Sequence, residues 1–134
     1  MITGRCECGK VKFEANDEIN DYSHCHCSQC RRLHGAAFAS FGGIDFGKLN
    51  FTCGKDEIRQ YASSPGSQRY FCGNCGSSLL VTVDSEPDAA YLAMGVIDGN
   101  PACPSGYHQF VGSKAPWYDI NDDLPRYELS IDDE

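Results

Sequence analysis

Seven of the nine cysteines in this 134-residue chain fall into three short clusters. A protein zinc site of the structural kind takes four tetrahedral ligands, usually from two short knuckles that lie far apart in the sequence. The outer two clusters fit that pattern, and glycines beside the second permit a tight turn that points backbone N–H groups at sulfur. We therefore predict one structural zinc site made by the four cysteines of these two clusters: Cys6, Cys8, Cys72 and Cys75.

The middle cluster lies in the stretch HCHCSQC, residues 24–30, and offers three thiols. Side chains alternate along an extended segment, so Cys25 and Cys27 would face one way and the two histidines the other. Cys30 follows across the start of a short helix and can return to the same side. Three cysteines leave the fourth tetrahedral position open for water or substrate, as in catalytic zinc sites.

A closed structural site is the alternative for this middle cluster. It would be completed by a fourth protein ligand, and spacing alone does not choose between the open and the closed site. The candidate fourth ligands are His24, His26, Cys53 and Cys103.

Composition and charge limit the other classes of function. An odd number of cysteines does not fit a complete disulfide framework, the N-terminus shows no signal-peptide pattern, and no run approaches the roughly 18 apolar residues of a membrane span. We expect a cytoplasmic protein that keeps its thiols reduced. A formal net charge of -8 argues against nucleic-acid binding, which depends on Lys and Arg.

The pattern of short apolar runs between turn signals predicts a mainly β fold with several small antiparallel sheets around the zinc knuckles. We expect one domain over residues 1–130 and an acidic tail over 131–134. One short helix should begin near Ser28 and end at Gly35. The expected strands cover residues 11–15, 36–44, 48–53, 68–72, 78–83, 89–96 and 107–111.

Two histidines and the tryptophan have ring side chains that could serve in the core or in a site. His108 lies on an expected strand, where a hydrogen-bonded core histidine is the ordinary role, but it is also a candidate for proton transfer, as is His26. Trp117 is the only tryptophan, and we expect it to pack in the core.

Four blocks of the sequence, taken in order, resemble the glutathione-dependent formaldehyde-activating enzyme family, which also includes centromere protein V. They are GRCECGKVKFE, HCHCSQCRRLHGA, YASSPGSQRYFCGNCGSSL and SKAPWYDINDDLPRY. The resemblance implies a fold similar to that of the Mss-type, Rab-interacting zinc proteins. It also implies the structural zinc predicted above and a second zinc on Cys25, Cys27 and Cys30.

The resemblance further implies a carbon–sulfur lyase with the reaction S-(hydroxymethyl)glutathione ⇌ glutathione + formaldehyde. Glutathione would then be a co-substrate, with Arg31 and Arg69 as candidates to bind its carboxylates. An alternative is a noncatalytic zinc module that binds glutathione or a protein partner. A third hypothesis has both zinc sites closed and purely structural. The sequence makes no prediction of oligomeric state.

Overall fold

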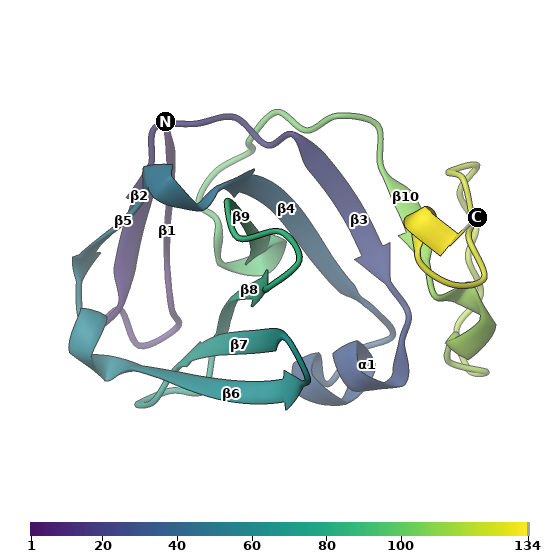
Figure 1. The fold of residues 1–134 in the computed structure, drawn as a ribbon, viewed down its shortest axis with the longest axis horizontal. Coiled ribbons are helices and arrows are strands. Elements are labelled where there is room, and N and C mark those ends of the chain that lie inside the picture. Colours follow the sequence, from purple (N-terminus) through teal and green to yellow (C-terminus); the bar gives the residue numbers. More distant parts are fainter. Residues whose placement is uncertain (134) are drawn as a thin grey trace.

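Two β-sheets and one α-helix make up the fold in the computed structural model, which describes residues 1–133 (Figure 1). The smaller sheet has the strand order β1-β2-β5, and the larger has the order β10-β3-β4-β9-β8-β7-β6. The strands are β1 (Ile2–Arg5), β2 (Lys12–Ala15), β3 (Asp21–Cys25), β4 (Ala39–Asp45), β5 (Leu49–Cys53), β6 (Ile58–Ser64), β7 (Ser67–Cys72), β8 (Ser78–Val83), β9 (Ala89–Ala93) and β10 (Tyr107–Gln109).

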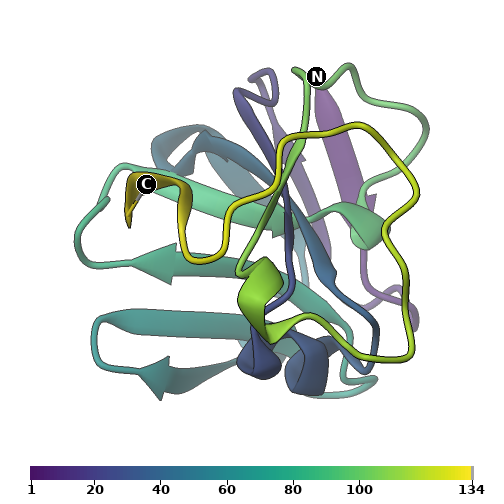
Figure 2. The same ribbon diagram turned by 90° about the vertical axis from the view of Figure 1, so that its right-hand side faces the viewer.

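The larger sheet is antiparallel except at its edge, where β10 pairs with β3 in parallel and places His108 opposite His24. The segment after β10 turns back along this edge, with the backbone N–H of Tyr127 donating to the carbonyl of His108. Figure 2 shows this C-terminal segment folded over the outside of the molecule. Of the predicted acidic tail, residues 131–133 form the 3-10 turn η5 (Ile131–Asp133), and residue 134 lies outside the described residues.

The mainly β fold class is confirmed, and strands occur in all seven stretches where the sequence predicted them. Three predicted strands are clearly shorter than expected, and one of them, β4, begins at Ala39 instead of residue 36. Residues 94–96 form a 3-10 turn after β9, and β10 ends before Phe110, whose φ is 57°. The seven predicted strands did not include β1, β3 or β6, although the segment that contains the end of β3 was expected to be extended.

The helix α1 (Ser28–His34) begins and ends where the sequence predicted. Cys27 is its N-cap, and its Sγ accepts a hydrogen bond from the backbone N–H of Cys30. Gly35 ends the helix in the left-handed conformation, with φ 59°. No helix in residues 1–133 has the length and apolar character needed to cross a bilayer.

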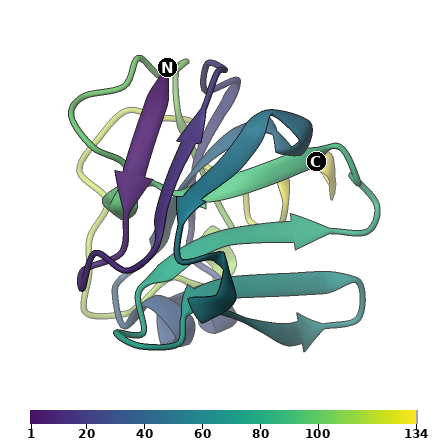
Figure 3. The same ribbon diagram turned by 90° about the vertical axis from the view of Figure 1, so that its left-hand side faces the viewer.

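The main core is built from side chains of both sheets. Figure 3 shows the two sheets side by side. It contains Phe13 and Leu92 and also two cysteines, Cys6 and Cys72, that are fully buried. A second buried cluster surrounds Cys25 and Cys30. Both core clusters therefore include cysteines of the predicted metal sites. The prediction for Trp117 was wrong, because this side chain is 69% exposed in the C-terminal segment.

Gly54 is a position where a side chain should destabilise the folded protein. Its φ is +73°, and a Cβ there would lie 1.9 Å from the carbonyl oxygen of Lys10. We expect Gly54→Ala to lower the free energy of unfolding by about 3 kcal/mol or more, because backbone must move. Gly35→Ala is the matched control: its φ is also positive, but a Cβ would meet nothing within 4 Å. It should cost about 1 kcal/mol. Chemical denaturation of both variants would measure the difference, and equal costs would contradict the steric argument.

Candidate metal centres

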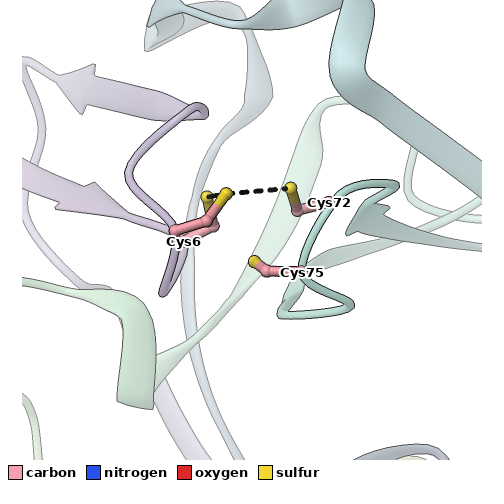
Figure 4. A group of neighbouring side chains, drawn as sticks. Cys6, Cys72 and Cys75 are labelled. Carbon is pink, nitrogen blue, oxygen red and sulfur yellow. Dashed lines mark hydrogen bonds between the residues drawn. The ribbon is translucent and has the colours of Figure 1, made fainter.

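The outer cysteines form a four-sulfur group. Cys6 and Cys8 follow β1, while Cys72 ends β7 and Cys75 lies in the turn after it. All four Sγ atoms lie within 4.8 Å of one another. The Sγ of Cys8 is 3.5 Å from that of Cys6 and 3.9 Å from that of Cys72. Figure 4 shows the side chains of Cys6, Cys72 and Cys75 converging from two separate loops.

The surroundings favour the thiolate at two of these four sulfurs, Cys8 and Cys75, whereas burial raises the pKa of Cys72 to about 11. The backbone N–H of Val11 donates to the Sγ of Cys6 at 3.3 Å. The side chain of Asn74 lowers the pKa of Cys8 by hydrogen bonding, and the Ser77 hydroxyl lowers the pKa of Cys75 to about 5. Four convergent cysteine sulfurs are the donor set of a structural zinc site, so these residues fit zinc.

The middle cysteines form a three-sulfur group, whose Sγ atoms also lie within 4.8 Å of one another. Cys25 ends β3, Cys27 caps α1 and Cys30 is the buried residue of that helix. Hydrogen bonds from the thiols of Cys25 and Cys30 lower the pKa of Cys27, whereas Cys25, which donates to Cys27, has a raised pKa. These three thiols fit zinc as well, and no fourth His, Cys, Asp or Glu donor joins them among the described side chains of residues 1–132.

The two histidines of the same stretch lie on the other face of β3, as strand alternation predicts. The ring of His24 is 4.9 Å from that of His108, and Nε2 of His26 is 2.8 Å from Nδ1 of His108. Nε2 of His108 in turn is 2.9 Å from a carboxylate oxygen of Asp122. If His108 donates to Asp122, its Nδ1 is left to accept from His26, which gives a continuous chain of donors and acceptors from the buried His26 to the exposed carboxylate of Asp122.

Burial lowers the pKa of His26 to about 4. We expect this histidine to remain neutral between pH 8 and pH 5, and its ring resonances in NMR spectra should not shift over that range. An unfolded chain binds a proton at this residue near pH 6.5, so stability should fall as the pH drops below 6.5. A midpoint near 6.5 for His26 in the folded protein would contradict this prediction.

A cavity of about 490 Å³ opens above the three sulfurs. Its lining follows one face of the larger sheet, in which Asp21, Ser23 and Cys25 alternate along β3 and Gln109 lies on the neighbouring strand. Further lining residues include Cys27, Gln29, Cys30, Arg69, Glu86, Tyr91, Tyr107 and Asp132. His26 and His108 do not line this cavity. The structure therefore does not bring either proton-transfer candidate to the sulfurs.

Asp21 is a cavity residue that the sequence reasoning missed. It lies four residues before Cys25, about 13 Å along the strand. Both carboxylate oxygens accept from the Tyr107 hydroxyl, at 3.1 and 3.2 Å, and burial raises the pKa of Asp21. The alternation that separated His24 from Cys25 would also have placed Asp21 on the cysteine face, had it been extended back along the strand.

The two predicted arginines differ in position. Arg69, on β7, lines the cavity, and its Nη2 lies 3.4 Å from the Sγ of Cys30. Arg31 does not line it, and its Nε is buried without a hydrogen-bond partner among the described residues. A neighbouring apolar cavity of about 470 Å³ shares three lining residues with the first: Phe41, Arg69 and Val81.

Comparison with known proteins decides the family. A family model described as glutathione-dependent formaldehyde-activating enzyme matches residues 1–113. The chain belongs to this family. The membership that the sequence blocks predicted is thereby confirmed.

Two individual relatives are similar to part of this chain. An uncharacterized lyase of Schizosaccharomyces pombe is 32% identical over 76 residues, which are 57% of this chain and 53% of that protein. A protein of Podospora anserina, provisionally named a glutathione-dependent formaldehyde-activating enzyme, is 30% identical over 63% of this chain and 40% of its own. The chain thus spans about half the length of these relatives or less.

A solved structure supports the fold. The crystal structure of a Rhodobacter sphaeroides protein is similar to this one with a TM-score of 0.62 and 25% sequence identity, over 73% of this chain and 89% of that one. The family, this neighbour and the two sulfur groups together agree with the predicted fold of β-sheets around zinc-type cysteine knuckles.

Proposed function

We propose that this protein is a zinc-dependent carbon–sulfur lyase that acts on a small thiol adduct such as S-(hydroxymethyl)glutathione. The observation that carries the proposal is the convergence of three thiols, with no fourth protein donor among the described side chains of residues 1–132, in the lining of a cavity of about 490 Å³. Cavities of this size hold small ligands in many proteins. Membership of the family and the names of its relatives support the same reaction class.

In the proposed reaction the C–S bond breaks and sulfur takes the electron pair, while the hydroxyl proton leaves as the C=O bond of formaldehyde forms and is returned to the sulfur, which gives the thiol of glutathione. Cys25, Cys27 and Cys30 would hold a second zinc, in addition to the one on Cys6, Cys8, Cys72 and Cys75. When bound there, zinc would supply a Lewis acid with a free coordination position. The burial of Cys25 and Cys30 shields the inner side of the site from water.

Binding of glutathione needs both positively and negatively charged groups in the protein, because glutathione carries two carboxylates and one ammonium group. Asp21 offers a carboxylate at the end of the cavity away from the sulfurs, and Arg69 offers a guanidinium beside them. That Arg31 and Arg69 bind substrate carboxylates stays a prediction, for which Arg69 has the better position. A cytoplasmic location also stays a prediction.

The noncatalytic thiol-binding module remains the second candidate. The placement of His26 and His108 on the other face of β3 favours it, because no histidine lines the cavity to transfer a proton. This candidate shares the metal sites and the thiol binding, and differs only in lacking catalysis.

Exchange NMR spectroscopy distinguishes the two candidates. The experiment would measure how fast S-(hydroxymethyl)glutathione exchanges with free glutathione and formaldehyde, with and without the zinc-loaded protein. The lyase predicts exchange faster than the spontaneous rate, with saturation as the thiol concentration rises. Saturable thiol binding with the spontaneous exchange rate would reject the lyase and support the binding module. The Cys53→Ser protein is the control, because Cys53 is exposed and lies outside both sulfur groups.

A further inference from the structure

The helix that carries Cys30 has little apolar anchoring. It is seven residues long, and Cys30 is its only buried residue. Helices this short are not stable in isolation, so tertiary contacts must fix their position. A metal held jointly by Cys25 on β3 and Cys30 on α1 requires the helix to stay in a defined position on the sheet. The contacts that fix α1 therefore bear directly on the metal site.

Arg69 lies at the centre of these contacts. Its Nη2 donates to Oε1 of Gln29 at 2.9 Å and lies 3.4 Å from the Sγ of Cys30, while its Nε donates to the Ser63 hydroxyl at 3.3 Å. Nε2 of Gln29 donates to the carbonyl of Ser63 at 2.9 Å. The first turn of α1 is thereby tied to the hairpin of β6 and β7, and Figure 1 shows the helix beside the turn of that hairpin.

The charge of Arg69 also matches the site. Three thiolates around a divalent zinc ion leave a formal charge of -1, which a neighbouring guanidinium offsets. Among the described residues that line the cavity, Arg69 is the one with a positive charge, and the other charged ones are acidic: Asp21, Glu86 and Asp132. Its Nη1 is buried without a hydrogen-bond partner among the described side chains of residues 1–132, a desolvation cost of the guanidinium that the contact of Nη2 with a thiolate would help to offset.

We infer that Arg69 is a positioning residue of the three-cysteine metal site, with two effects. It holds Cys30 and α1 in the place that metal binding needs, and its charge lowers the energy of the bound thiolates. This role differs from binding a substrate carboxylate. The inference rests on the second metal site proposed above and does not depend on the lyase reaction.

Metal affinity tests the inference within one molecule, because the four-cysteine site is an internal reference. Zinc binding at each site would be measured by chelator competition for wild type, Arg69→Met and Arg69→Lys. We expect Arg69→Met to weaken the three-cysteine site by about 10- to 100-fold and to leave the four-cysteine site unchanged. Arg69→Lys should restore part of the affinity, because it keeps the charge but loses the planar guanidinium. Arg32→Met is the control, since Arg32 is exposed on the same helix.

Cobalt spectra give a signature that a general loss of structure would not produce. A positive charge beside a thiolate stabilises its electrons, so sulfur-to-cobalt charge transfer needs more energy. We expect the band of the three-cysteine site to move to longer wavelength in Arg69→Met and to stay near its wild-type position in Arg69→Lys. Gln29→Met removes the tie to the helix but not the charge, and should weaken metal binding without moving the band. The Cys27→Ser protein identifies which band belongs to this site.

The outcomes separate the two proposals. If wild type binds two metal ions and Arg69→Met has wild-type affinity and an unchanged band, the role of Arg69 is rejected while the metal site stands. Equal weakening of both sites in Arg69→Met would also reject it, as would a loss of the same size in Arg32→Met. If the three-cysteine group of wild type binds no metal, the proposed function fails, and the inference fails with it.

Discussion

The Cys27→Ser protein should contain one zinc ion per chain where wild type contains two, and it should no longer respond to added thiols. A serine hydroxyl is a poor zinc ligand beside the two remaining thiolates, and the Sγ of Cys27 also caps α1. Catalysis of adduct exchange should fall to the spontaneous rate, whereas the fold should remain because the main core lies around the other site. Metal analysis followed by a thiol titration would measure both effects.

A serine at Cys53 is the matched control for this experiment. Cys53 is exposed and belongs to neither sulfur group, so Cys53→Ser should keep two zinc ions and the full thiol response. Retention of both zinc ions and of full turnover in Cys27→Ser would show that the three-cysteine group is not the catalytic metal site.

Replacement of Cys72 by alanine should have the largest effect on stability. Cys72 is fully buried in the main core beside Cys6, and the four-cysteine site links the start of the chain to the loop after β7. Structural zinc sites contribute about 10 kcal/mol or more to folding in small zinc domains. A whole domain of this size is stable by only about 5–15 kcal/mol. We therefore expect the Cys72→Ala protein to be unfolded at 37 °C and to show no cooperative melting transition.

Circular dichroism with thermal melting, combined with metal analysis, would measure this loss. A strong chelator should unfold wild type in the same way. The control is Cys103→Ser, because Cys103 is exposed and outside both groups, and its melting temperature should be that of wild type. A Cys72→Ala protein with a wild-type melting transition would mean that the four-cysteine site does not stabilise the fold.

The parts of this protein that the sequence predicted are those with local signals. The helix depends on a cap at Cys27 and a glycine at position 35, both of which lie within its own segment. The strands with runs of β-branched and aromatic residues were also predicted from the sequence and are present in the structure. β6 was missed because its outer position on the sheet leaves most of its residues exposed, so they lack an apolar pattern.

The assignment that failed depended on where a distant segment lies. Trp117 has a side chain typical of a core, but its segment crosses the outside of the molecule. Proton transfer by His108 stays a prediction: its pairing with β3 makes it a buried, hydrogen-bonded histidine that faces His26 and Asp122 and does not line the cavity. Strand pairing sets which face a side chain occupies, and a single sequence does not contain that pairing.

The sequence by itself determined how the cysteines of this protein group: one set of four and one set of three, with the neighbouring histidines on the other face of the strand. It could do so because knuckle spacing and strand alternation act over a few residues. Only the tertiary structure decided that Cys53 and Cys103 stay away from the three-cysteine group, that Asp21 shares its cavity, and that Arg69 lies against Cys30. These are contacts between segments up to dozens of residues apart, and packing of the whole chain fixes them.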